Sequence, residues 1–341
     1  MTNRSLTLLL VLVLAAVAAA LVLRFVGEAE PATEASSPTS NGAPDPGASS
    51  TTPPAPAEPA ESSTTTIAAT TSTLAPGATA CDRYEEIETI GTVQNPALTE
   101  ISGVAAGRIN PGVLWVHNDS QDGPIVYAID TTGQSVGTYQ LDGAFAFDWE
   151  DMAAGPGPVE GVPYLYLGDI GDNFEIRGGS ITLYRVPEPS VATSGDVLSD
   201  VETIPLRYPD GSPNAEAMFI DPVDATLYIV TRDTEVTRVY RADGSAGETE
   251  QTMEPVATLD LGHEVTGADI AHDGTVIALR GEEHVHLFHR PAAASIAEAL
   301  SGEPCSAPAP DEIQGEALAF LSDGAYVTLS EDIGSPIHRV P

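Results

Sequence analysis

The chain carries the same local pattern five times between residues 102 and 328. In each repeat a short apolar run is followed, about ten to fifteen residues later, by a second apolar run that ends in polar residues. The first runs open at Ser102, Glu150, Glu216, Ala268 and Glu316, with spacings of 48, 66, 52 and 48 residues. A repeat of about 50 residues that contains several short apolar runs is typical of one blade of a β-propeller.

Each pair of apolar runs predicts two antiparallel strands joined by a tight turn, as in residues 216–230 with the turn 221–224. Two weaker strand candidates follow in most repeats, which gives the four strands that a blade needs. The last repeat stops one strand short after residues 336–340, whereas residues 86–93 precede the first repeat as a strand without a blade. We therefore predict an all-β fold over residues 81–341, a five-bladed β-propeller closed by its N-terminal strand.

The N-terminal residues predict a membrane anchor or an export signal. Residues 6–23 are apolar with one exception and are flanked by Arg4 and Arg24. The small residues 17–20 offer a cleavage site, yet a run of this length also reaches the lower limit for a membrane span. We predict an uncleaved signal anchor over residues 1–26, with a cleaved signal peptide as the alternative. The propeller would then lie outside the cytoplasm, at the cell membrane or, after cleavage, as a secreted protein.

Residues 27–80 are dominated by Pro, Ala, Ser, Thr and Glu, and no aromatic residue lies between Phe25 and Tyr84. Such a segment cannot bury enough apolar surface to fold. We expect a disordered linker with a root-mean-square reach of about 40 Å, which holds the propeller off the membrane.

The two cysteines lie near the two ends of the predicted propeller, Cys81 before its first strand and Cys305 before its last repeat. An even number of cysteines in an exported chain favours a disulfide. A bond between Cys81 and Cys305 would join the segments where the ring closes. Two unrelated thiols are the alternative.

The net charge is −37, and all 13 basic residues are arginine. A chain this acidic repels nucleic acid, which we exclude as a general partner. Adaptation to a salty medium would explain acidic residues scattered over the loops, and bound cations would explain those at the ring centre. We expect a monomer whose partners are the membrane, through residues 1–26, and a small phosphorylated ligand or a surface protein.

The first strand of each blade lines the central channel, so the five opening residues should ring the axis near one face. The carboxylates of three glutamates there would raise one another's pKa unless a cation lay among them. Ligands that are all oxygen atoms favour a hard ion, and calcium suits a fivefold ring better than magnesium does. We predict a Ca²⁺ site with the ligands Ser102, Glu150, Glu216, Ala268 (through its carbonyl) and Glu316. Glutamates held by water and by arginine pairs are the alternative.

Polar residues at the ends of the second strands would surround the mouth of the channel. Asp119 and Asp169 are candidate catalytic residues, since either could orient and deprotonate a water molecule. Arg232 and Arg280 could hold a phosphate group, and Trp149 could stack against a ligand.

Several short segments together resemble the calcium-activated nucleotidases, or soluble apyrases. The segments are Ile101-Ser102-Gly103-Val104, Trp115-Val116-His117-Asn118-Asp119, Asp148-Trp149-Glu150, Leu165-Tyr166-Leu167-Gly168-Asp169-Ile170-Gly171, Ala215-Glu216-Ala217, Ile277-Ala278-Leu279-Arg280-Gly281-Glu282-Glu283 and Gly315-Glu316-Ala317-Leu318. The resemblance implies a five-bladed propeller with calcium on its axis. Phytase-like propellers are more distantly similar.

The resemblance also implies roles for single residues. Calcium ligands are implied at Ser102, Glu150, Glu216 and Glu316, with a serine in the family where this chain has Ala268. An acid is implied at Asp119 and phosphate contacts at Arg232 and Arg280. Ser120 stands where the family has an arginine.

Two classes of function follow. The first is a membrane-tethered, calcium-binding propeller that binds a ligand or a protein, and the second is a calcium-dependent phosphohydrolase of nucleotides or other phosphoesters. Because Ser120 removes a positive charge from the phosphate pocket, we favour the binding class. The chain has no Gly-x-Ser-x-Gly, P-loop or His-Glu-x-x-His motif of other hydrolase classes.

Overall fold

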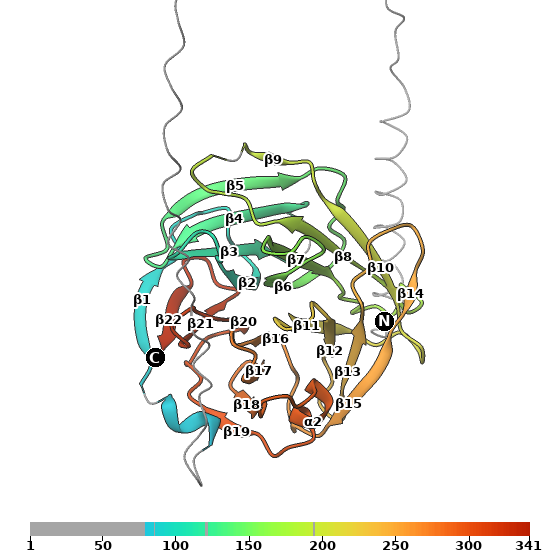
Figure 1. The fold of residues 1–341 in the computed structure, drawn as a ribbon. Helices are drawn as coiled ribbons and strands as arrows, with labels where there is room; N and C mark the ends of the chain where they lie inside the picture. The colour runs from blue at the N-terminus through green and yellow to red at the C-terminus, as the bar shows by residue number, and fades with distance from the viewer. Residues whose placement is uncertain (1–78, 85, 120–121, 194) are drawn as a thin grey trace, which may run out of the picture. The chain divides into compact units, whose positions relative to one another are not determined.

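A computed structural model describes residues 79–341 except residues 85, 120, 121 and 194. The predicted anchor and residues 27–78 of the predicted linker lie outside the described residues. The described part is a β-propeller of five blades, as the sequence predicts (Figure 1). Among these residues, no helix is both long enough and apolar enough to cross a membrane.

Each blade is built on four antiparallel strands, of which the first lies nearest the axis (Figure 1). Blade 1 comprises β2 (Ile101–Ala106), β3 (Val113–Asn118), β4 (Ile125–Asp130) and β5 (Ser135–Leu141). Blade 2 comprises β6 (Trp149–Pro156), β7 (Pro163–Asp169), β8 (Ser180–Pro187) and β10 (Glu202–Arg207). Blade 3 comprises β11 (Ala215–Ile220), β12 (Leu227–Thr231), β13 (Thr237–Ala242) and β15 (Glu254–Leu259). Blade 4 comprises β16 (Gly267–Ile270), β17 (Val276–Arg280), β18 (Val285–His289) and β19 (Cys305–Ala307). Blade 5 comprises β20 (Gly315–Phe320), β21 (Tyr326–Ser330), β22 (Pro336–Val340) and β1 (Glu88–Thr92).

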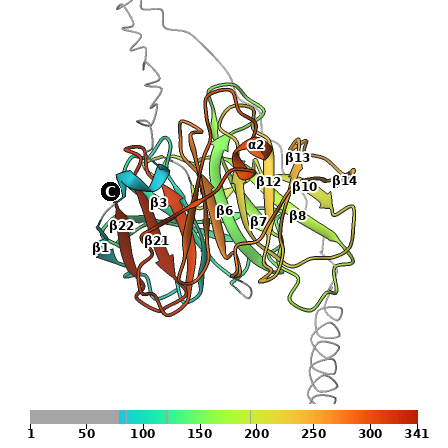
Figure 2. The same ribbon diagram turned by 90° about the horizontal axis from the view of Figure 1, so that it is seen from below.

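The N-terminal strand completes the last blade, which confirms the predicted closure. β1 pairs antiparallel with β22, with Glu88 opposite Arg339 and Thr92 opposite Pro336. The inner strands β2, β6, β11, β16 and β20 contact one another in that order, and β20 contacts β2. The strands run between the two faces of the ring (Figure 2). The inner strands therefore form a closed wall around one channel.

Two of the connections between strands extend to the preceding blade, where each adds a short parallel strand at the outer edge. β9 (Val197–Leu198) pairs with β5 of blade 1, although it lies between β8 and β10 in the chain. β14 (Gln251–Thr252) pairs with β10 of blade 2 in the same way. The longest repeat spacing, 66 residues between Glu150 and Glu216, thus contains an excursion to blade 1 rather than a sixth blade.

The hydrophobic core is divided into five clusters, each between two adjacent blades. Trp115 and Trp149 lie in the cluster between blades 1 and 2, and Phe320 and Tyr326 lie in that between blades 4 and 5. Both faces of an inner strand are covered by neighbouring blades, so every residue of β2, β11 and β20 is buried. The inner strands therefore carry apolar residues on both faces instead of in alternation, and the polar residues that open the repeats interrupt these apolar runs.

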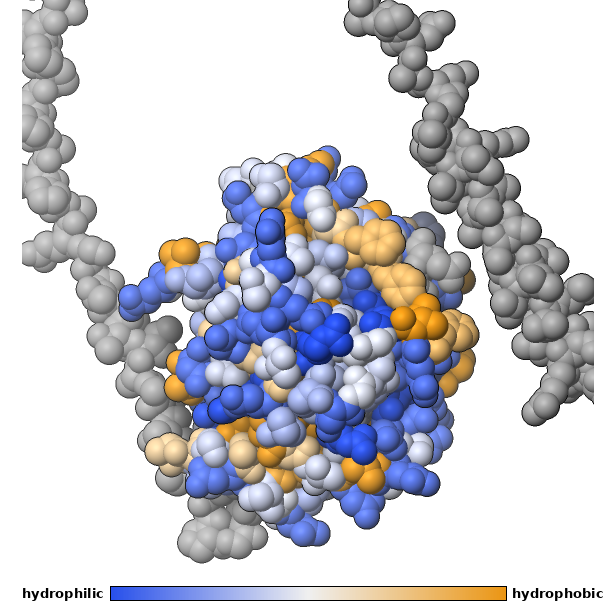
Figure 3. Space-filling model, turned by 90° about the vertical axis from the view of Figure 1, so that its right-hand side faces the viewer, coloured by the Kyte–Doolittle hydropathy of each residue, from blue (hydrophilic) through white to orange (hydrophobic). Residues whose placement is uncertain are grey.

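Hydrophilic residues cover most of the side of the molecule that Figure 3 shows, with apolar residues gathered in a few places. The exposed large apolar side chains include Phe145, Phe147, Phe174 and Ile176. A hydrophilic surface agrees with the strongly acidic composition.

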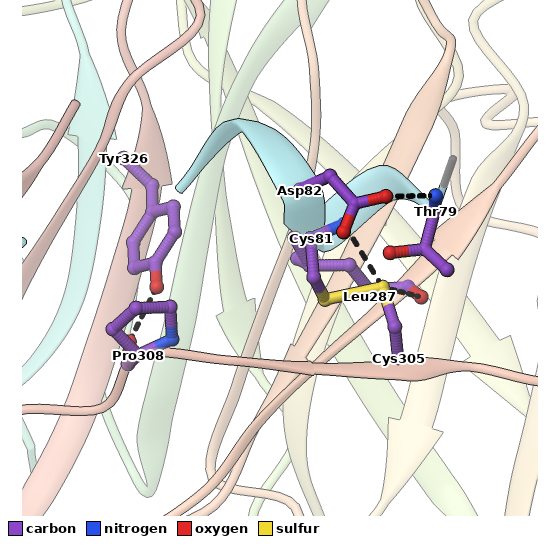
Figure 4. Close-up of a disulfide and its surroundings, with 7 residues drawn as sticks. All are labelled: Thr79, Cys81, Asp82, Leu287, Cys305, Pro308 and Tyr326. Carbon is purple, nitrogen blue, oxygen red and sulfur yellow. Dashed lines mark hydrogen bonds between the residues drawn. A yellow bond between two sulfur atoms is a disulfide. The ribbon is translucent and has the colours of Figure 1, made fainter. Parts of the chain in front are cut away.

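Cys81 and Cys305 form the predicted disulfide (Figure 4). Their Cα atoms are 5.9 Å apart. Cys81 lies in the 3₁₀-helix η1 (Ala80–Arg83), and Cys305 is the first residue of β19. Tyr84, which follows η1, donates a hydrogen bond from its hydroxyl to the carbonyl of Gly324 at 3.0 Å. The disulfide therefore fastens the segment that leads into blade 5 onto β19, the outer strand of blade 4.

Reduction of this disulfide is expected to lower the free energy of unfolding by about 2–4 kcal/mol. The two cysteines are 224 residues apart in the sequence. For a loop of that length, chain entropy predicts a stabilisation of about 5 kcal/mol, but measured gains are usually smaller. Urea denaturation with and without reductant measures the loss, and the Cys81→Ser/Cys305→Ser double variant is the control that reductant should not affect. An unchanged unfolding midpoint after reduction of the wild type would contradict this expectation.

Candidate metal centre

Four of the five residues that open the repeats lie at β-bulges in the inner strands. In blade 1 the pairing register shifts between Ile101 and Gly103, so Ser102 has no partner on β3. Shifts of the same kind in blades 2, 3 and 5 leave further residues unpaired: Glu150 with Asp151, Glu216, and Glu316. A bulge breaks the alternation of a strand and re-aims the extra side chain.

The bulged side chains meet at one end of the channel, which we call the mouth. Ser102 Oγ donates a hydrogen bond to Glu150 Oε2 at 3.4 Å. Burial raises the pKa of Glu150 well above its usual value, and the negative charges of Glu216, Asp119 and other carboxylates raise it further. The structure thus brings together side chains from blades 1, 2, 3 and 5.

The pKa values of two other carboxylates show how crowded the mouth is. Burial raises the pKa of Glu316 to about 8, and the charges of Glu216 and Glu331 add to this effect. Burial likewise raises the pKa of Glu331 to about 7, with a further contribution from Asp119. Protons and a divalent cation would compete for these oxygens.

Asp119, Asp148 and Glu150 come closest to forming a metal site. One oxygen atom from each lies within 4.8 Å of the other two. Glu150 is 5% exposed, and its Oε1 receives no hydrogen bond from any residue that the structure describes. A buried oxygen without a donor, set among carboxylates, fits a cation with oxygen ligands.

Gly171 shapes one side of this cluster. A Cβ atom added there would lie 2.1 Å from Glu150 Oε1 and 2.6 Å from Asp148 Oδ2. Only glycine therefore lets both carboxylates lie against the backbone after β7. A side chain at residue 171 would fill the space in which the two oxygens converge.

Glu216 differs from Glu150 because it already has a cationic partner. Arg232 forms an ion pair with Glu216 and also donates to Glu264 Oε2 at 2.6 Å. Asn214 Nδ2 donates to Glu216 Oε1 at 3.1 Å. Burial raises the pKa of Glu216, while Arg232 and Asn214 lower it in part. At this position the structure shows the arginine pair that the sequence left open as the alternative to a metal.

In blade 4 the residue that opens the repeat is Ala268, which has no carboxylate and lies in a strand without a bulge. Ala268 pairs regularly with Leu279, and its N–H donates to Asp151 Oδ2 at 3.2 Å. Asp151 is fully buried and also accepts hydrogen bonds from the N–H groups of Met152 and Met218, both at 2.8 Å. Burial raises the pKa of Asp151 well above its usual value. One carboxylate therefore ties together the inner strands of blades 2, 3 and 4.

The two predicted catalytic residues have different surroundings. Asp119 is half-buried within the carboxylate cluster, and its N–H donates to the carbonyl of Glu100 at 2.8 Å. Asp169 is buried, forms an ion pair with Arg177 and accepts a hydrogen bond from the N–H of Asp148 at 3.0 Å. The carboxylate of Asp169 thus holds the loop after β7 in place.

Two predicted ligand-binding residues are part of the core. Arg280 is 1% exposed, forms an ion pair with Glu312 and donates to the carbonyl of Ala317 at 2.8 Å. Trp149 has no exposed surface, and its ring lies 6.0 Å from that of Tyr184. In this arrangement neither side chain is accessible to a ligand, whereas the side chain of Arg232 is 26% exposed.

Sequence reasoning did not assign Asp148 to the site. It lies two residues before Glu150, a spacing that places both side chains on one face of an extended strand. That alternation was the available signal. Asp148 has its pKa raised by burial, an effect that Arg177 opposes.

A second feature that the sequence did not predict is an apolar lip beside the carboxylates. It consists of Phe145 and Phe147, which precede β6, and Phe174 and Ile176, which follow β7. The guanidinium of Arg177 lies 4.7 Å from the centre of the Phe147 ring, which brings the two loops together. The lip and the carboxylates thus share one side of the mouth.

No protein-family model matches this chain, and no curated protein matches its sequence. The five-bladed fold is therefore established by the structure alone, and the resemblance to calcium-activated nucleotidases has no further support. Ser120, where the chain departs from the pattern of that family, lies outside the described residues.

Proposed function

We propose that the protein is an extracytoplasmic, membrane-tethered propeller that binds calcium at its mouth and uses the same face to bind a ligand or a protein. The observation that carries the proposal is Glu150 Oε1, which is buried and without a donor among the described residues, with oxygens of Asp119 and Asp148 nearby. The disulfide supports a location in an oxidising compartment.

The chemistry of the donors favours calcium over other metals. Asp119, Asp148 and Glu150 offer carboxylate oxygens, and Ser102 adds a hydroxyl that already contacts Glu150. No sulfur or imidazole ligand joins these four residues, so a soft or borderline metal would gain little. Calcium accepts six to eight oxygens in loose geometry, whereas magnesium demands an octahedron. Bound there, the ion would neutralise the converging charges.

The apolar lip favours the binding class of function. Exposed aromatic side chains that adjoin fixed charges are typical of recognition sites, because they supply contact area at small entropic cost. Phe145 and Phe174 are 65% and 82% exposed. A ligand that contacts both the lip and the carboxylates would combine apolar burial with polar contacts.

A calcium-dependent phosphohydrolase is the second candidate, favoured by the partly exposed Arg232 at the mouth. Arg232 would have to leave Glu216 and Glu264 to contact a phosphate group. Arg280, the other predicted phosphate contact, is buried against Glu312. These pairings leave the binding class as the better supported.

Calcium is expected to raise the melting temperature of the purified protein by about 5–10 °C. A ligand at a hundredfold excess over its dissociation constant adds about 2.7 kcal/mol, which in a domain of this size corresponds to several degrees. The shift should be larger at pH 8.5 than at pH 5.5. The raised pKa values of the neighbouring Glu316 and Glu331 mean that both are protonated at pH 5.5, so their negative charges then no longer attract the cation.

Thermal melts in calcium, in magnesium and in chelator measure this effect. Equal melting temperatures in calcium and in chelator at both pH values would refute the calcium site. A screen of nucleotides and phosphoesters on the calcium-loaded protein separates the two functions, and robust turnover would favour the hydrolase.

A further inference from the structure

A cavity lies among the turns on the face of the ring opposite the mouth. Its volume is about 240 Å³, many times what a single water molecule needs. It is lined by the turns that follow the inner strands of blades 1, 4 and 5, which carry Arg108, His272 and Ser322. Pro111, Leu114 and other apolar residues form part of its wall.

Among the described residues that line this cavity, Arg108 is the only one with a positive charge at neutral pH. Every arginine that the structure describes forms an ion pair with a carboxylate except Arg108 and the exposed Arg83. Arg108 Nη2 donates to the carbonyl of Ala154 at 2.8 Å, but the buried Nε has no acceptor among the described residues. In a chain with 50 acidic residues, a partly buried guanidinium without a carboxylate partner is unusual.

Burial lowers the pKa of Arg108, an effect that the charges of Asp269 and Glu188 oppose. Arg108 thus has fewer compensating contacts than its environment requires. An anion that accepted hydrogen bonds from the guanidinium and carried the opposite charge would supply such contacts.

The remaining polar groups of the cavity limit the charge of the anion. His272 Nε2 lies 3.1 Å from the carbonyl of Phe320, so the ring donates there, and burial lowers its pKa to about 4. His272 is therefore neutral at physiological pH. Asp323 also lines the cavity and pairs with Arg339 at 2.8 Å. A dianion would meet one guanidinium and a nearby carboxylate, whereas a monoanion would be balanced by Arg108.

We propose that this cavity binds a small organic monocarboxylate, with the carboxylate on Arg108 and an aliphatic group against Pro111, Leu114 and Leu321. The guanidinium supplies paired N–H donors in the planar geometry that a carboxylate matches. The apolar wall supplies the contact that a bare inorganic anion lacks. The site is independent of the mouth and of its metal.

The proposal is tested by calorimetric titration of the full-length protein with isobutyrate, in chelator so that the mouth plays no part. Isobutyramide, the neutral amide of the same shape, and inorganic phosphate are the comparison probes. We expect isobutyrate to bind at least tenfold more tightly than either. Equal affinity for isobutyrate and isobutyramide, tighter binding of phosphate, or no binding of isobutyrate would each overturn the proposal.

Two variants locate the site. Arg108→Gln should weaken isobutyrate at least tenfold, and Ser322→Trp, at an exposed turn residue, should abolish binding by filling the cavity. Arg241→Gln is the matched control, because Arg241 is exposed and pairs with Glu254 on blade 3. Should Arg108→Gln fail to fold, Ser322→Trp decides alone. Wild-type affinity in Ser322→Trp, or in a folded Arg108→Gln, would disprove this location.

Discussion

Replacing Asp151 with alanine is expected to lower the free energy of unfolding by about 4 kcal/mol. The carboxylate accepts hydrogen bonds from the N–H groups of Met152, Met218 and Ala268, all of which are buried. Each buried donor that loses its acceptor costs about 1–3 kcal/mol. The substitution also removes the desolvation cost of a buried carboxylate, which offsets part of that loss. This cost is visible in the pKa of Asp151, which burial raises well above its usual value.

Urea denaturation of Asp151→Ala beside Asp142→Ala measures this loss, since Asp142 is an exposed aspartate at the end of blade 1. Asp142→Ala should change the free energy of unfolding by less than about 0.5 kcal/mol. The free energy of unfolding of Asp151→Asn should lie between those of the two alanine variants. Its amide oxygen can still accept hydrogen bonds, whereas its amide nitrogen faces a backbone donor. Equal unfolding midpoints for the two alanine variants would show that the three N–H groups find other acceptors.

Glu150→Gln is expected to weaken calcium binding by about a hundredfold or more, which corresponds to about 2.7 kcal/mol. The substitution keeps the shape of the side chain but removes one negative charge, and calcium affinity depends strongly on the number of charged ligands. It also leaves an amide in a pocket that is closed on one side by Gly171. Calorimetric titration with calcium at pH 8.5 measures the change.

Gly171→Ala provides an independent test of the same site. Its methyl group would overlap the oxygens of Glu150 and Asp148, so calcium should bind more weakly although no ligand is removed. Glu248→Gln, at an exposed loop residue, is the matched control for charge. Wild-type affinity in both Glu150→Gln and Gly171→Ala would place calcium elsewhere.

Much of the fold could be predicted because it is periodic. The spacing of the opening residues gave the number of blades, and the missing last strand gave the closure by residues near Glu88. The disulfide followed from two cysteines at the two ends of the ring. These features depend on repeated local patterns and on chain order, both of which are visible in a single sequence.

The site was harder to predict because it depends on irregularities. The regular alternation of a strand does not reveal that Ser102 and Glu316 lie at bulges and have no partner on the next strand. Nor does it reveal that the carboxylate of Asp151 accepts hydrogen bonds from N–H groups of three inner strands. Whether Glu216 faces a metal or Arg232 depends on a neighbouring strand rather than on its own. Arg280 is paired with Glu312, a partner that no local spacing identifies.

The pairing of β1 with β22 has a consequence for how the chain folds as it is synthesised. Thr89 and His338, which contact each other across this pair, are 249 residues apart. During synthesis β1 therefore has no partner strand until β22 has emerged, and contacts of such long range form slowly. β1 is suited to this delay because it is short, three of its five residues are exposed, and a bulge at Ile90 interrupts its pairing edge. Such an edge is a poor template for neighbouring nascent chains.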